Sequence, residues 1–141
     1  MEKEIQKFDE VFHYDWYDGP ISGVANRNGK PYFFEYQKYN EINKESYYLT
    51  PIKEEILQLA IEDWQIWKRW DTAFHKGEVK IDTHPYLPEE RKRGKELKEK
   101  LEKVLKIDKS NYIELDAEFR IKGNQENVLG MKKLIVKWKE K

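Results

Sequence analysis

Residues 12–24, FHYDWYDGPISGV, place four aromatic rings, two carboxylates, one imidazole and two glycines in one short stretch. Aromatic rings favour burial, whereas carboxylates need water or a partner. Asp18-Gly19-Pro20 forces the backbone to turn. A stretch with these three requirements belongs either to the tightly packed end of a sheet or to the edge of a binding site. The residues alone leave both possibilities open.

Four strands are predicted around this stretch, because aromatic and polar side chains alternate with a period of two. Gly23 in the second strand indicates a bulge or the close approach of another backbone. Asn28-Gly29 predicts a type I′ hairpin turn, since both residues tolerate a positive φ. The four strands are expected at residues 8–17, 21–27, 31–38 and 47–49.

A long helix is predicted after Thr50-Pro51, because threonine is a good N-cap and proline fits the first helical position. Its apolar stripe recurs with 3.6-residue spacing as far as Phe74 and carries three tryptophans, and Gly77 can end the helix. A second helix is predicted from Pro88 to about Lys106. Its apolar stripe is narrow, which predicts a solvated surface helix, and Gly94 weakens its start by roughly 1 kcal/mol relative to alanine.

Residues 112–122 and 131–139 alternate apolar and charged side chains and predict two final strands. In the last of them, Leu134, Val136 and Trp138 share one face. The element order is ββββ-α-α-ββ, and the tight turns between strands imply antiparallel pairing. We therefore expect an α+β fold with a single domain, residues 1–141. An antiparallel sheet of about six strands would pack against one long Trp-rich helix and a second surface helix.

The composition excludes several classes of function. The chain has 141 residues and no cysteine, which excludes disulfides, thiolate zinc sites, iron–sulfur clusters and cysteine nucleophiles. Lys+Arg and Asp+Glu are both 27, so the even charge balance argues against a nucleic-acid partner. No window approaches the roughly 18 apolar residues of a membrane span. No apolar segment of a signal peptide follows the charged first residues, so we expect a cytoplasmic protein.

The three histidines, His13, His75 and His84, are the residues that a metal site would need first. They show no His-x-x-x-His or His-Glu-x-x-His spacing, so we predict no metal site. The phosphate-binding and nucleophile motifs of common enzymes are also missing from the sequence, and we predict no cofactor.

The predicted binding residues gather at two places in the sequence. Strand alternation puts His13, Asp15 and Tyr17 on one face, just before the turn at Asp18. Near the end of the long helix, Trp70 lies at the edge of the apolar stripe, whereas Trp64 and Trp67 are predicted to be core. We expect a ligand at one rim that unites both places, formed by His13, Asp15, Tyr17, Asp18, Trp70, Asp71, His75 and His84.

Four segments carry a resemblance that covers most of the chain: YDGPISGVA at residues 17–25, GKPYFFE at 29–35, EDWQIW at 62–67 and AEFR at 117–120. Together they resemble short bacterial or phage proteins of unassigned function. This resemblance implies no activity and no site residues.

We expect a binding protein rather than an enzyme, with a small molecule or a protein as the partner and with self-association possible. Two alternatives stay open. The first is a phage-type protein that sequesters a nucleotide immune signal, with stacking rings and Arg27 or Arg69 for the phosphate. The second is a small hydrolase that uses His13 or His75 with an aspartate, which requires the two groups to lie within hydrogen-bond reach in a cleft.

Overall fold

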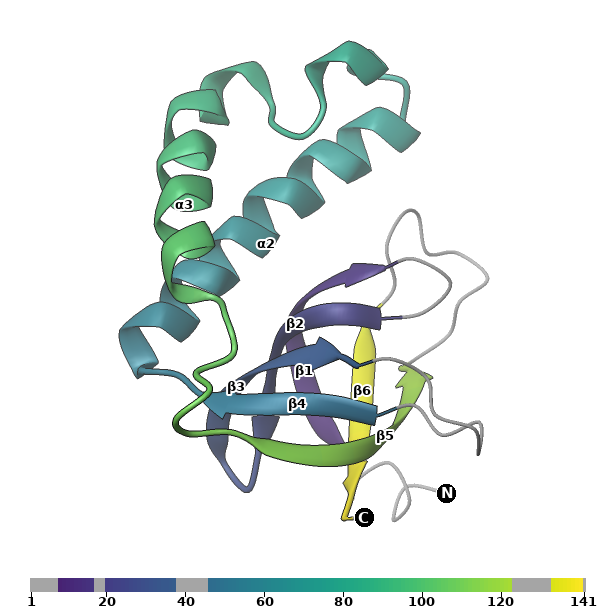
Figure 1. Ribbon diagram of the computed structural model, residues 1–141. Coiled ribbons are helices and arrows are strands. Elements are labelled where there is room, and N and C mark those ends of the chain that lie inside the picture. The colour runs from purple at the N-terminus through teal and green to yellow at the C-terminus, as the bar shows by residue number, and fades with distance from the viewer. Residues whose placement is uncertain (1–7, 17–19, 38–45, 123–132, 141) are drawn as a thin grey trace.

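The structure, a computed structural model, describes residues 8–16, 20–37, 46–122 and 133–140. Their order of strands and α-helices is the predicted ββββ-α-α-ββ, with two short 3₁₀ helices, Ile81–Thr83 and Pro88–Glu90, between the α-helices (Figure 1). The strands and α-helices are β1 (Asp9–Trp16), β2 (Pro20–Arg27), β3 (Lys30–Tyr36), β4 (Ser46–Pro51), α2 (Glu54–His75), α3 (Arg91–Val104), β5 (Ile113–Ile121) and β6 (Leu134–Lys139).

The strands form a closed barrel, and this corrects the predicted sheet packed against a helix. Each strand pairs antiparallel with the next along the chain, and β1 also pairs with β6, at Asp9↔Val136 and Glu10↔Ile135. Closure pairs the first and last strands, which would be the two edges of an open sheet. An irregularity in β1 between Val11 and His13 adds local bend and twist, as bulges do. Alternation along each strand is the same in an open sheet and in a barrel, so closure cannot be predicted from this pattern.

Aromatic side chains fill the barrel. The buried cluster inside it draws on all six strands, and Leu134 and Val136 belong to it with Trp138 packed against it, which confirms the predicted face of β6. The rings of Phe34 and Tyr47 meet edge to face at 72°, with 5.7 Å between centroids, and those of Phe34 and Trp138 meet at 61° and 5.7 Å. Such edge-to-face pairs add to the stabilisation from burial.

Gly23 and the Asn28-Gly29 turn behave as predicted. A Cβ on Gly23 would lie 2.1 Å from the His13 carbonyl oxygen and 2.8 Å from the Phe34 ring, so the close approach requires glycine. Asn28 and Gly29 have φ values of 54° and 77°, as a type I′ turn between β2 and β3 requires.

The long helix begins later than predicted. Thr50 and Pro51 belong to β4, and α2 starts at Glu54. Its N-cap residue is Lys53, whose side chain makes no capping hydrogen bond. The buried Thr50 hydroxyl donates to the carbonyl oxygen of Asn111 at 2.6 Å, so it ties β4 to the chain before β5 rather than capping the helix. Two glutamates in the first turn of α2 still complement the helix dipole.

Helices α2 and α3 pack together on one side of the barrel (Figure 1). Leu57 and Ala60 of α2 and Leu101 of α3 pack on Val24, whose side chain points out of the barrel. Gly94 is buried, and a Cβ there would lie 2.4 Å from the Tyr86 ring, so this glycine serves packing at some cost in helix propensity. Most other side chains of α3 are exposed, as its narrow stripe predicts. Neither helix is apolar enough over sufficient length to cross a membrane within the described part of the chain.

Candidate binding groove

A groove of about 870 Å³ lies between the outer face of β1, β2 and β3 and the two helices. Strand register explains the barrel wall of the groove. Because side chains alternate, Tyr14 is buried and packs into the barrel core, while its neighbour Asp15 is exposed; both line the groove. Asp15 pairs with Ser22, and Ser22 pairs with Glu35, so these three side chains form a polar row across three strands. The Ser22 hydroxyl donates to Asp15 at 3.3 Å.

A His–Asp pair that lines the groove joins β1 to α2. The Nε2 atom of His13 lies 2.9 Å from the Oδ2 atom of Asp63, and both side chains are mostly buried. The carboxylate in reach of His13 is thus Asp63, fifty residues away, and not the neighbouring Asp15 that its strand position suggested. The Nδ1 atom of His13 is buried and finds no hydrogen-bond partner among the described residues.

The helix wall of the groove is aromatic. Trp64 and Trp67 stack with 5.4 Å between centroids and an angle of 28°, and both line the groove. Trp64 also contacts Tyr14 at 4.8 Å. Both tryptophans are only partly buried, whereas Trp70, expected at the exposed edge, is 3% exposed. Trp70 is therefore a core residue, whereas Trp64, which packs against the barrel core as predicted, and Trp67 both also reach the groove.

The physical reason for the burial of Trp70 is that α2 changes its packing partner along its length. Its first half packs on the barrel. Farther along α2, Ile66 packs against Tyr86, which lies between the two 3₁₀ helices, and against Leu97 of α3. Trp70, one helical turn after Ile66, lies on the same side of α2, and its indole N–H donates to the Thr83 hydroxyl at 2.8 Å. Trp67 is left beside the groove.

The predicted rim is assembled only in part. His13, Asp15 and His84 line the groove, and Trp70 lies directly behind His84, with perpendicular rings and centroids 4.6 Å apart. Tyr17 and Asp18 lie outside the described residues.

Asp71 and His75 are not among the groove residues; they belong to the last turns of α2. There the Nδ1 atom of His75 lies 2.8 Å from the Asp71 carbonyl oxygen and 3.4 Å from its carboxylate. Asp71 therefore orients His75 within the last turns of α2, and neither residue lines the groove.

Sequence reasoning missed most of the groove wall. Asp63 and Trp64 come from the part of α2 that contacts β1. Tyr86 comes from the chain between the two 3₁₀ helices, and Glu102 comes from α3. One signal was available: Asp63 is a carboxylate directly beside the apolar stripe of an amphipathic helix. Such a position asks for a partner on the surface that the helix covers.

The described lining residues carry an excess of negative charge. They include four carboxylates, of Asp15, Glu35, Asp63 and Glu102, and a single lysine, Lys98. Tyr86 also lines the groove, and the pKa of its hydroxyl is raised by burial and then by the carboxylates of Asp63 and Glu102.

Two arginines of the helices, Arg69 and Arg93, are held by carboxylates outside the groove. Arg69 binds Glu90, with Nε 2.9 Å from Oε1, and Arg93 binds Glu62 through Nε at 2.6 Å. The hydrogen bonds to these glutamates raise the pKa of both arginines. Arg27 lies 3.7 Å from Glu140. None of the three arginines is among the groove residues.

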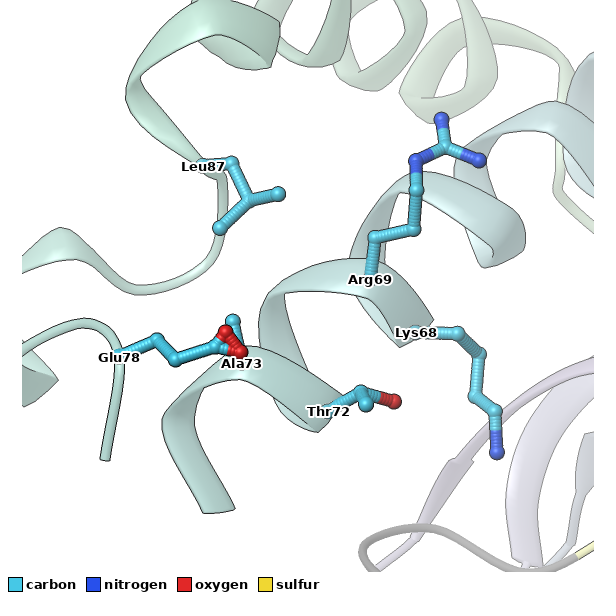
Figure 2. A pocket seen from close by; sticks show the side chains of 6 residues that line it. All are labelled: Lys68, Arg69, Thr72, Ala73, Glu78 and Leu87. Carbon is cyan, nitrogen blue, oxygen red and sulfur yellow. The ribbon is translucent and has the colours of Figure 1, made fainter. Parts of the chain in front are cut away.

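A second, shallower hollow of about 380 Å³ lies beside α2 (Figure 2). Lys68 and Arg69 are its basic residues, and Figure 2 shows that their side chains point away from each other. Convergent polar groups are typical of ligand sites, and this hollow has none among its six labelled side chains. It is the weaker candidate.

The fold and the site together define a small closed barrel that carries a helical hairpin and a lateral groove. Within the described residues, no three His, Asp or Glu side chains lie close enough together to hold a metal ion. Comparisons with protein-family models, with curated proteins and with solved structures give no significant match.

Proposed function

We propose that this protein is a binding module that holds a small, flat organic molecule in the groove between the barrel and the helices. The observation that carries the proposal is the composition of the two walls. The stacked Trp64 and Trp67 rings form one wall, and the polar row of Asp15, Ser22 and Glu35 lies on the other. Pockets for small molecules combine aromatic walls with a few placed polar groups in this way, and their volumes run from about 300 to 1,000 Å³.

Binding is better supported than hydrolysis. A general base needs a nitrogen that can reach the proton of a substrate or of a water. In His13 the Nε2 atom is bound to Asp63 and the Nδ1 atom is buried. The pair therefore suits a structural role, in which it fixes α2 against β1 and holds the groove at its width.

The proposal is tested by a fragment screen with NMR detection of the tryptophan indole N–H signals. Flat aromatic fragments should shift the signals of Trp64 and Trp67 and leave that of Trp138, in the barrel core, unchanged. Trp67→Leu should weaken binding of these fragments by about tenfold, since base-like stacking on one aromatic side chain contributes roughly 1–3 kcal/mol.

Tyr112→Leu is the matched control, because Tyr112 is an aromatic residue that is exposed and does not line the groove. It should leave the affinity unchanged. A screen in which no fragment moves the Trp64 and Trp67 signals would contradict the proposal, and so would equal losses of affinity in both variants.

A further inference from the structure

We propose that the ligand is an organic cation, in which an ammonium group is joined to a flat ring. The inference rests on the proposed function and adds the charge of the ligand. It follows from three features of the groove: the excess of carboxylates, the stacked tryptophans, and the pairing of the nearby arginines with glutamates elsewhere.

The carboxylates come from four different elements, so the charge is concentrated by the fold rather than by a local acidic run. Asp15 and Glu35 come from β1 and β3, Asp63 from α2 and Glu102 from α3. Lys98 is the one lysine among the described lining residues, and it precedes Glu102 by one helical turn. Side chains at this spacing are neighbours, so Lys98 offsets one of the four carboxylates and three are left in excess.

The Tyr86 hydroxyl lies within the influence of two of these carboxylates. Its side chain is buried and lines the groove, and burial, and then the charges of Asp63 and Glu102, raise the pKa of its hydroxyl. Charges that line a concave, partly desolvated surface focus their field and concentrate ions of opposite sign. A cation in this groove is therefore attracted by several carboxylates together.

The tryptophans favour the same class of ligand. The face of an aromatic ring carries partial negative charge, and tryptophan is the strongest of the three rings in attracting a cation. Trp64 and Trp67 stack in the groove and are both partly exposed. A ring joined to an ammonium group can stack on this wall while its charge faces the carboxylates on the strands.

Among the described groove residues, a phosphate-bearing ligand finds no arginine. Bidentate arginine is the usual partner of phosphate, and Arg69 and Arg93 are bound by Glu90 and Glu62 outside the groove. A nucleotide would bring its negative charge against an excess of three carboxylates. The charge of the groove thus separates an organic cation from the nucleotide alternative.

Three probes with the same ring and different charge test the inference on the full chain: 2-phenylethylammonium, 2-phenylethanol and 3-phenylpropionate. NMR titration should give an affinity about tenfold higher for the ammonium probe than for the alcohol, with the carboxylate weakest. Equal affinities, or a preference for 3-phenylpropionate, would overturn the charge inference while leaving ring binding in the groove intact. If none of the three moves the Trp64 and Trp67 signals, the proposed function fails as well.

A pair of variants on one helix localises the effect. Glu102 lines the groove, whereas Glu99 lies one turn earlier on α3, is also exposed, and does not line it. Glu102→Gln should weaken 2-phenylethylammonium binding by about threefold and leave 2-phenylethanol unaffected, and Glu99→Gln should change neither. Equal losses in the two variants would mean a general attraction to an acidic surface and would overturn the site.

Discussion

The inner and outer faces of β1, β2 and β3 differ although they are built from adjacent residues of the same strands. Tyr14, Gly23 and Phe34 are buried with the barrel core, and each is followed or preceded by a residue of the outer row. The outer row of Asp15, Ser22 and Glu35 lines the groove. The inner face is filled to contact distance, so it determines whether the barrel closes. The outer face leaves a hollow, so it is available to a ligand.

Because of this difference, we expect substitutions at inner residues to change stability and substitutions at the adjacent outer residues to change binding. A protein interior is close-packed, and removing or adding atoms there is costly. A solvated surface position tolerates the same changes within about 0.5 kcal/mol. Substitutions in neighbouring pairs, one inner and one outer, are therefore the sharpest way to test the division.

The largest effect is expected at Phe34, which is fully buried and touches the rings of Tyr47, Phe119 and Trp138. Phe34→Ala should lower the free energy of unfolding by about 4 kcal/mol, from lost burial and the cavity left behind. Glu35→Ala, one residue on and on the outer face, should change it by less than about 0.5 kcal/mol. Urea unfolding of both variants measures the difference. Similar losses in the two would break the assignment of the faces.

A smaller loss is expected at Gly23. A Cβ there would overlap the His13 carbonyl oxygen, which is backbone and cannot turn aside. Gly23→Ala should therefore lower the free energy of unfolding by about 3 kcal/mol through overpacking. Ser22→Ala, the outer neighbour, should lose only the exposed 3.3 Å hydrogen bond to Asp15 and stay within about 0.5 kcal/mol of the parent in the same urea experiment. An unchanged Gly23→Ala variant would mean that β1 and β2 are not held this closely.

The sequence predicts most elements of this fold but not its closure. The Asn28-Gly29 turn, the helix ending near Gly77 and the apolar face of β6 are local patterns, and each is present. Closure depends on the pairing of β1 with β6, at opposite ends of the chain, and on the bend of β1. Neither leaves a local pattern. The helix N-cap predicted at Thr50 was wrong for a related reason. Thr50 belongs to β4, and its hydroxyl donates a long-range hydrogen bond to the carbonyl oxygen of Asn111.

The candidate groove was predictable only on its strand side. His13 and Asp15 follow from alternation in β1, and both line the groove. The stacked Trp64 and Trp67 were expected in the core, because periodicity gives the apolar face of a helix but not which neighbour each turn meets. Asp63 could not be paired with His13 from the sequence, since fifty residues separate them and only the docking of α2 on β1 brings them together.

The smallest expected effect concerns the inner face at high pH. Burial raises the pKa of the Tyr14 hydroxyl well above its ordinary value of 10.0. Above that pH the unfolded chain releases this proton while the folded protein keeps it, so the unfolded state binds fewer protons and the free energy of unfolding falls as pH rises. Below pH 10 the contribution of Tyr14 to this dependence vanishes. Urea unfolding between pH 9 and about 11.5 should therefore show a decline in the parent that is steeper than in Tyr14→Phe by up to about 1.4 kcal/mol per pH unit. Asp15→Asn, the outer neighbour, should keep the slope of the parent in this range, because it leaves the buried Tyr14 hydroxyl in place. A Tyr14→Phe variant with the parent's slope would mean that Tyr14 reaches water, and the inner face would not be closed at this end of β1.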